Sequence, residues 1–165
     1  MADLSTAMGF FTQALAAQQL GELGAAERAL REAMRYAPEP EPVGARLMSL
    51  LTGQGKFSEA RRVARDMLAD APGCISAWAG LALCEIECGE PLQALACAQR
   101  AAQLGPSVAV AYGVLGRVLY RLERYDESLT AYDAALRLSP QAAEWLAGRA
   151  AVLRVLGRVE AAMTT

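Results

Sequence analysis

The stretch GKFSEARRVARDMLADAP, residues 55–72, contains a pattern that returns along the whole chain. It opens on a glycine and closes on a proline, and both residue types recur every 34 residues, with Glu123 in the one slot where glycine is missing. The prolines are Pro38, Pro72, Pro106 and Pro140, and the glycines are Gly21, Gly55, Gly89 and Gly157. A fixed period of this length indicates an array of one repeated structural unit.

Each unit contains two amphipathic segments of helical period. In the third unit they read SAWAGLALCEIECG, residues 76–89, and LQALACAQRAAQLG, residues 92–105, with apolar residues at three- and four-residue steps. Gly89 is placed to end the first helix and Pro91 to begin the second. The pattern predicts an all-α chain built as one array of antiparallel helix pairs. The units are residues 7–40, 41–74, 75–108 and 109–142, with a partial unit at 143–165.

Small residues recur where the two helices of a unit approach each other. In the third unit they are Ala82, Ala94 and Ala101. Small side chains there permit a short distance between the helix axes. The second unit has Met48 and Met67 at two of these places, which predicts a slightly wider spacing. Its first aromatic position holds Gly44, which predicts weaker local packing.

The partial fifth unit contains a complete first helix, residues 144–156, followed by RVEAAMTT, residues 158–165, as the start of a second. The chain is therefore expected to form nine helices of about 12–15 residues and a short tenth, two to each unit. Two interpretations stay open, a fragment of a longer protein and a terminal cap, and the many apolar residues favour the fragment. An uncovered apolar strip near Val152, Leu156 and Met163 predicts self-association through this end.

Composition excludes several classes of function. The net charge of −2 and the absence of a basic run argue against a nucleic-acid partner. No run approaches the roughly 20 apolar residues of a membrane span, and the N-terminus does not resemble a signal peptide, so a cytoplasmic protein is expected. Histidine is absent, and no catalytic or nucleotide-binding motif is present, which predicts a protein that is not an enzyme and has no cofactor. The bias toward alanine, arginine, leucine and glycine suggests a bacterial source.

The units resemble tetratricopeptide repeats, whose 34-residue pattern carries aromatic, small and proline residues at set places. The fourth unit matches with Tyr112, Leu115, Gly116, Tyr125, Tyr132, Ala135 and Pro140. The third matches with Trp78, Leu81, Ala82, Gly89, Ala94, Ala101 and Pro106. The resemblance implies a right-handed superhelical solenoid of about four and a half units. It also implies that the first helices line a concave groove in which peptides bind.

The resemblance, applied by register, predicts which residues line that groove. The candidate binding residues are Phe11, Leu15, Leu83, Arg117, Tyr120, Arg121 and Arg154. The register also places there Met8, Gln18, Gln19, Ala45, Ser49, Thr52, Ala79, Ile86, Glu87, Val110, Gly113, Glu144, Ala147 and Ala151. The arginines are expected to converge and bind an acidic or C-terminal segment of a partner, because guanidinium groups bind carboxylates with two hydrogen bonds. The simpler alternatives are a solvated charged face and ordinary helix-packing residues.

The dicarboxylate clamp of chaperone-binding family members requires lysine, asparagine and arginine along the groove. Only Arg46 fits, and the chain has no asparagine, so binding of chaperone tails is not expected. The four cysteines, Cys74, Cys84, Cys88 and Cys97, gather in the third unit. Their spacing is not that of a metal site, so they are expected to be packing residues, with no metal bound.

The predicted function is therefore that of an adaptor. It is a non-enzymatic scaffold that binds an extended or helical segment of another protein in its groove, without inserting into a membrane. Two alternatives stay open. The chain is the targeting region of a larger bacterial enzyme, a glycosyl- or sulfotransferase, or it is a secretion-type chaperone.

Overall fold

The chain folds into an array of α-helices. The computed structural model describes the backbone of residues 3–163 and the side chains of residues 3–157, and within this part every regular element is a helix. The helices are α1 (Leu4–Gln19), α2 (Leu23–Tyr36), α3 (Glu41–Gly53), α4 (Phe57–Asp70), α5 (Ile75–Glu87), α6 (Pro91–Leu104), α7 (Ala109–Arg121), α8 (Tyr125–Leu138) and α9 (Ala143–Met163). The predicted all-α fold is confirmed.

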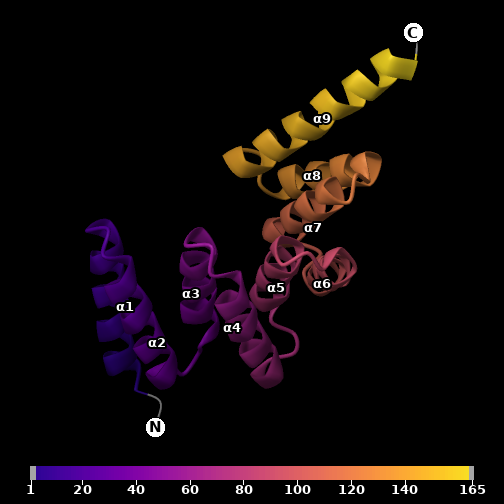
Figure 1. Cartoon of the computed structure of the whole chain (residues 1–165). Coiled ribbons are helices and arrows are strands. Elements are labelled where there is room, and N and C mark those ends of the chain that lie inside the picture. The colour runs from indigo at the N-terminus through magenta and orange to yellow at the C-terminus, as the bar shows by residue number, and fades with distance from the viewer. Residues whose placement is uncertain (1–2, 164–165) are drawn as a thin grey trace.

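The helices are arranged in two layers. Consecutive helices pack as antiparallel pairs, α1 with α2, α3 with α4, α5 with α6 and α7 with α8 (Figure 1). The first helices also pack from pair to pair, α3 with α5, α5 with α7 and α7 with α9, and form the inner layer. The pairs follow one another along a curved array whose termini lie at opposite ends. The described part of the chain is thus a helical repeat solenoid of four pairs and one further helix.

The tight turn within each helix pair contains one residue whose backbone has the left-handed conformation, with a positive φ angle. Gly21, Gly55 and Gly89 have φ values of 76°, 73° and 83°. Glycine adopts this conformation without the steric cost that a Cβ imposes. Glu123 takes the same place in the fourth pair with a φ of 60°, which costs roughly 1–2 kcal/mol for a residue with a side chain. The packing of α7 against α8 therefore keeps the turn's shape even where glycine is absent.

The prediction of a short tenth helix is wrong. The backbone of α9 continues as one helix of 21 residues through Gly157, where the sequence predicted a turn. Extending an existing helix adds a hydrogen bond for each residue that is fixed, whereas a new helix first requires a costly nucleus. A single glycine in helical conformation costs only about 1 kcal/mol, so it does not break the helix by itself. Among the described residues no helix has both the length and the apolar character that a membrane span requires.

Alanines occupy the close approaches between helices, as predicted. Ala26, Ala60 and Ala94 are fully buried at the same position of three successive units. Ser128 takes this position in the fourth unit and is also fully buried. Its hydroxyl donates a hydrogen bond of 2.7 Å to the backbone oxygen of Gly116. A buried polar group is tolerated when it is paired in this way, so serine serves here in place of alanine.

The two helices of the second unit stand further apart than those of the other pairs, as Met48, Met67 and Gly44 predicted, because α3 and α4 contact each other less extensively than α1 with α2, α5 with α6 or α7 with α8. A Cβ added at Gly44 would overlap the side chain of Met67, so the methionine fills the space that the aromatic residue leaves. Met48 lies in the same way against Gly80 of α5, whose added Cβ would be 2.9 Å from the Met48 sulfur. Gly44 and both methionines are buried. Met67 therefore fills the gap at Gly44 itself, although the two helices of this unit remain further apart than in the other pairs.

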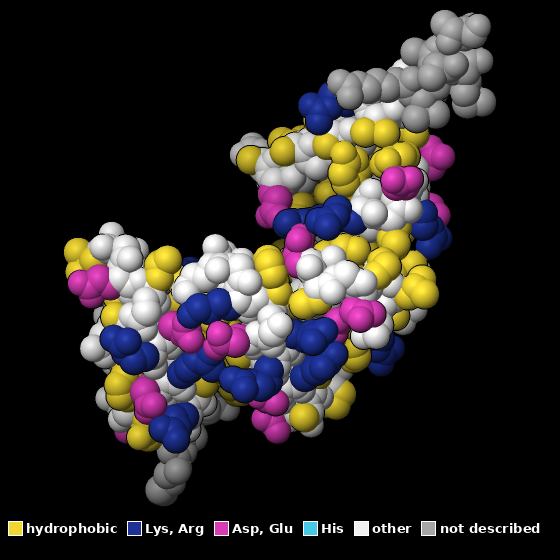
Figure 2. All heavy atoms as spheres, in the orientation of Figure 1, with side chains coloured by type: hydrophobic (Ala, Val, Ile, Leu, Met, Phe, Trp, Pro, Cys, Tyr) yellow, Lys and Arg dark blue, Asp and Glu magenta, His cyan; other side chains and the backbone are white. Residues whose placement is uncertain are grey.

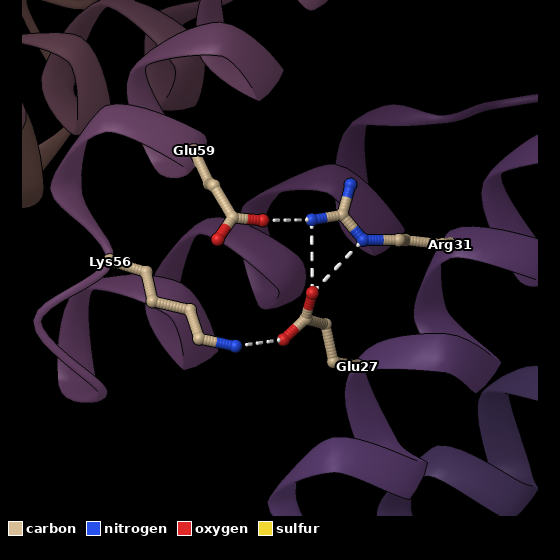
Figure 3. A network of polar contacts seen from close by, with 4 residues as sticks. All are labelled: Glu27, Arg31, Lys56 and Glu59. Carbon is tan, nitrogen blue, oxygen red and sulfur yellow. Dashed lines mark hydrogen bonds and ion pairs between the residues drawn. The ribbon is translucent and has the colours of Figure 1, made fainter.

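Charged side chains link the first two units on their outer layer (Figure 3). Arg31 of α2 donates hydrogen bonds to Glu27 on its own helix and, at 2.7 Å, to Glu59 of α4. Lys56, in the turn before α4, donates to the other oxygen of Glu27 at 2.7 Å. The Lys56 hydrogen bond, together with that of Arg31, lowers the pKa of Glu27. The network therefore joins α2 and α4 most strongly when Glu27 is ionised.

A second charged group lies in the interior. Glu85 of α5 interrupts the apolar stripe of its helix, and its side chain is 1% exposed. Arg61 and Arg65 of α4 reach it at 3.1 and 2.8 Å and bind one carboxylate oxygen each. A buried carboxylate requires such partners, because its hydration is lost on folding. Glu85 thereby links the second unit to the third.

Three of the four cysteines pack in the core. Cys74, Cys84 and Cys97 are buried, as predicted. Cys88 at the end of α5 is exposed, so the packing interpretation is wrong for this residue. Burial raises the pKa of Cys84 to about 11, which keeps this thiol protonated near neutral pH. Within the described side chains, no group of three Cys, Asp, Glu or His residues is arranged to hold a metal ion.

Candidate interaction groove

The inner layer of helices encloses a groove between α3, α5, α7 and α9. Its cavity has a volume of about 400 Å³. The lining residues are Ala45, Met48, Ser49, Thr52, Ser76, Ala79, Gly80, Leu83, Val110, Val114, Arg117, Glu144 and Trp145. Each lining residue lies on a first helix, the type of helix that the sequence placed at the concave face.

The floor of this groove is apolar and made largely of small residues. Ala45, Ala79 and Gly80 leave the backbone of α3 and α5 close to the open space. Leu83 is half-buried, packs against the main core and also faces the cavity. Val110 and Val114 continue the apolar surface onto α7. An apolar side chain or a helix of a ligand can lie close to such a surface and lose most of its contact with water.

The predicted arginines are already engaged by carboxylates of the chain. Arg121 donates to Glu87 Oε1 at 3.0 Å, and Arg117 lies 4.0 Å from the same oxygen. Arg117 also lies 3.9 Å from a carboxylate oxygen of Glu144. Arg117 and Arg121 therefore converge, as predicted, but they converge on Glu87. Arg154, which was predicted to join them, neither contacts Glu87 nor lines the cavity. Figure 2 shows arginine and acidic side chains next to one another where α7 and α9 border the hollow of the array.

These groups form a wall of mixed charge rather than a basic cluster. The side chains of Arg117 and Arg121 are both about half exposed, at 48% and 47%, so water screens their pairing with Glu87. A ligand carboxylate can therefore exchange with Glu87 at these guanidinium groups. Arg154 is exposed on α9, and the described residues include no ion-pair partner for it. The pairing of Glu87 with Arg121 has a sequence signal, since the two residues are 34 positions apart.

Tyr120 is part of the core more than of the groove. Its ring packs edge to face on Tyr125, with the ring centroids 5.8 Å apart. Both rings adjoin the smaller core cluster that contains Tyr132 and Trp145. Leu15 is half-buried on α1 and is not among the residues that line the groove cavity. The structure thus brings Leu83, Arg117 and Arg121 to one region and leaves Tyr120 and Leu15 outside the cavity.

Phe11 lies at a second cavity, at the N-terminal end. This cleft of about 410 Å³ opens between α1, the loop after α2 and the start of α3. Its lining is apolar except for Glu39 and is formed by Leu4, Ala7, Met8, Phe11, Ala37, Pro38, Pro42 and Val43. In the following four units the register position of Phe11 holds Ala45, Ala79, Gly113 and Ala147. The large ring of Phe11 thus stands where the other units have small residues, and α1 contacts α3 less than α3 contacts α5.

Trp145 is a groove residue that the sequence reasoning missed. It lines the cavity and is otherwise buried, at 7% exposed. Its indole lies flat over Gly113 of α7, where an added Cβ would be only 2.5 Å from the ring. The preceding units have Ala77 and Ala111 at its register position. The sequence signal was this single exchange of alanine for tryptophan, together with the glycine that accommodates it.

Models of the tetratricopeptide repeat match most of the sequence. One model matches residues 17–84 and 51–118, and a second matches residues 114–165. A comparison with curated proteins gave no significant match. The matched segments together run from residue 17 to the end of the sequence.

Solved structures with the same fold extend this result. A thermophilic TPR protein of Thermus thermophilus, TTC0263, is similar with a TM-score of 0.80 and 18% identity over 93% of this chain and 84% of that one. The MamA fragment from residue 41 to the end, from Desulfovibrio magneticus, has a TM-score of 0.66 and 17% identity over 94% and 93%. The first TPR of Spaghetti (RPAP3), bound to the HSP90 peptide SRMEEVD, has a TM-score of 0.62 and 20% identity over 71% and 93%.

The repeat period, the two layers of antiparallel helices and the matching repeat models agree with one another. The chain belongs to the tetratricopeptide repeat family.

Proposed function

We propose that the chain is a non-enzymatic interaction scaffold that binds a segment of a partner protein in the groove between α3, α5, α7 and α9. The observation that carries this proposal is the combination of an open apolar floor with a charged wall in one cavity of about 400 Å³. Apolar burial there contributes roughly 25 cal/mol for each Å² removed from water. The wall adds direction and selectivity, because charged groups at the edge of an interface choose partners more than they add affinity.

The ligand we propose is a segment with an apolar side chain and a neighbouring carboxylate. The apolar group lies on Leu83 and Val114, and the carboxylate binds Arg117 and Arg121 in place of Glu87. This exchange keeps both guanidinium groups paired, and the displaced Glu87 carboxylate, which is partly exposed, is hydrated instead. A related fold bound to the peptide SRMEEVD supports the general mode of binding. The residues used here differ, because Phe11 and Leu15 stand where the clamp of chaperone-binding members has polar groups.

Charge reversal in the wall tests this proposal. The variant with Arg117→Glu and Arg121→Glu places four carboxylates around the site, the two new ones with Glu87 and Glu144, and it is expected to reduce capture of the partner by about tenfold or more, as losing a charged contact does. The matched control reverses Arg100 and Arg137, which are exposed on the second helices α6 and α8.

Capture is measured with a photo-crosslinking residue at Ser49, which lies in the groove, followed by mass spectrometry of the adduct. A partner crosslinked at Ser49 in the wild type and lost in the Arg117/Arg121 variant supports the proposal. The same partner retained at unchanged affinity by that variant, or lost equally in the control, contradicts it. Circular dichroism establishes that both variants keep their helices.

We also propose that the chain self-associates through α9, although not through the residues expected from the sequence. Val152 is fully buried against α8 and cannot contribute to such a surface. Leu156 is partly buried in the same core, and the side chain of Met163 lies outside the described residues. The exposed apolar residues of α9 are instead Leu146 and Leu153, at 47% and 42% exposed. These two residues support self-association through the opposite face of the helix.

A further inference from the structure

We propose that this chain binds a second copy of itself head to tail, with α9 of one copy lying in the cleft between α1 and α3 of the next. The inference rests on the self-association proposed above and names its two surfaces. The donor surface is the apolar ridge formed by Leu146, Ala147, Ala150 and Leu153. The acceptor surface is the cleft lined by Leu4, Met8, Phe11 and Pro42.

The ridge is a continuous stripe on one side of α9. Its four residues recur at helical steps, and each is exposed. The opposite side of the same helix carries Trp145 and Val152, which pack in the core. The stripe is therefore apolar without serving the packing of the copy to which it belongs. The two alanines between the leucines allow another element to approach the helix closely.

The cleft at the N-terminal end is also apolar without being filled. Leu4 and Met8 are 58% and 60% exposed, one turn apart on α1. In the other units the first helices pack on their successors, whereas α1 and α3 make no comparable contact and Phe11 lines the gap between them. The cavity of about 410 Å³ lies on the far side of the array from α9 (Figure 1). One copy therefore cannot fill its own cleft with its own ridge, whereas a second copy can.

The two surfaces agree in length and in charge. Leu146 and Leu153 are seven residues apart, as are Leu4 and Phe11, and both spans correspond to about 10.5 Å along a helix. The one charged residue of the cleft is Glu39. The charged residue next to Leu153 is Arg154, for which the described residues include no ion-pair partner. An ion pair between Glu39 and Arg154 of two copies would fix the direction in which the helix lies.

Head-to-tail contacts have a consequence that symmetric contacts do not have. Each copy retains one free donor and one free acceptor, so the assembly extends with concentration unless its rotation closes a ring. The groove between α3, α5, α7 and α9 uses different residues and stays open. An extended assembly therefore presents the groove many times, which raises its avidity for a partner that carries several binding segments.

A complementation experiment tests the proposal on the 165-residue chain. Met8→Glu disables the acceptor and Leu153→Glu disables the donor. Both side chains are exposed in the single copy, so neither variant should change the melting temperature by more than a few degrees. The molar mass of the wild type, measured by light scattering after size exclusion, should rise with concentration. Each variant alone should remain a monomer, and an equimolar mixture of the two should form a dimer and stop there.

Each alternative gives a different result. If Met8→Glu still self-associates while Leu153→Glu does not, the contact is a symmetric pairing of α9, and the head-to-tail inference is wrong. The reverse result assigns a symmetric contact to α1 and also overturns it. A wild type that stays monomeric at millimolar concentration overturns self-association altogether, while binding in the groove is still measured by the Ser49 crosslink. Reversal of both charges, Glu39→Arg with Arg154→Glu, should restore the association that either reversal alone weakens.

Discussion

The second and fourth units fill the space between their helices in opposite ways. The second unit places flexible methionines against glycines, Met67 on Gly44 and Met48 on Gly80 of the next unit. The fourth unit places rigid rings against glycines. Tyr132 of α8 lies between Gly116 of α7 and Gly148 of α9, and Trp145 of α9 lies on Gly113 of α7. In both units a glycine on one helix faces a large side chain on the neighbouring helix. The repeat therefore keeps the total side-chain volume at each helix contact rather than the identity of each residue.

The methionine packing of the second unit and the ring packing of the fourth differ in how easily their side chains can rearrange. Methionine has three rotatable bonds and fills irregular gaps, so the second unit can accommodate small changes. Tyr132 is held between Gly116 and Gly148, and Trp145 is buried with its ring against Gly113, so neither rigid ring has such freedom. The fourth unit should therefore be the stiffer of the two, and it carries Arg117 and Arg121 at the wall of the groove. Stability measurements on matched substitutions separate the two behaviours.

Removing the ring of Tyr132 should have the largest effect on stability. Tyr132→Ala takes away a buried aromatic side chain of α8, at 5% exposed, that contacts both α7 and α9. Large-to-small changes of this kind cost about 3–5 kcal/mol of unfolding free energy. Chemical denaturation followed by circular dichroism measures the loss. Tyr132→Phe is the control and should cost less than about 1 kcal/mol, because it keeps the ring; an equal loss in both variants would contradict the packing explanation.

A methyl group added at Gly113 should have the next largest effect. The new Cβ would lie 2.5 Å from central atoms of the Trp145 ring, and the ring has no flexible end that could move aside. We expect Gly113→Ala to lower the unfolding free energy by about 1–3 kcal/mol through this overpacking. Near-ultraviolet circular dichroism should change as the indole tilts. A variant as stable as the wild type, with unchanged tryptophan signals, would show that Trp145 is free to move.

The same substitution at Gly44 should have a much smaller effect. Gly44→Ala also overlaps a neighbour, but that neighbour is the end of the flexible Met67 side chain. Alanine favours the helix by about 1 kcal/mol over glycine, which offsets the displacement. We expect an unfolding free energy within about 1 kcal/mol of the wild type. Both substitutions gain the same helix propensity. The difference between their unfolding free energies therefore measures how much more rigid Trp145 is than Met67. Equal losses at the two sites would remove the distinction between the units.

Periodicity predicted the fold because the register repeats whatever the individual residues are. It placed the turns at Gly21, Gly55 and Gly89, and the resemblance to tetratricopeptide repeats then implied the inner helices and most residues of the groove. Leu83 and Arg117 were predicted to lie in the groove and do so. Contacts between units were harder to predict. They depend on how far apart neighbouring units stand, which Phe11 and Trp145 alter locally and a repeat pattern does not encode.

Compensation between distant positions was also beyond the sequence. Gly44 alone indicated weak packing, and its partner Met67 lies 23 residues later, on the facing helix. The ion pair between Arg121 and Glu87 could have been expected from the sequence, because the two residues take the same position in successive units. The contact from Arg117 could not, because it depends on side-chain rotamers on two helices.

The smallest expected effect on stability concerns the ionic contact between the first and second units. The fourth unit is instead joined to its neighbour by aromatic packing. The hydrogen bond from Lys56, with that from Arg31, lowers the pKa of Glu27 below its ordinary value of 4.5. The folded state thus favours the ionised form, so this contribution to stability is present above pH 4.5 and is lost as the pH falls through the lowered pKa. Glu27→Gln should make the unfolding free energy less dependent on pH in this range, and Glu32→Gln, on the exposed side of α2, is the control. Titration of the unfolding midpoint between about pH 6 and 3 measures the difference between the two variants. Parallel curves for Glu27→Gln and the wild type would mean that the network in Figure 3 does not stabilise the fold.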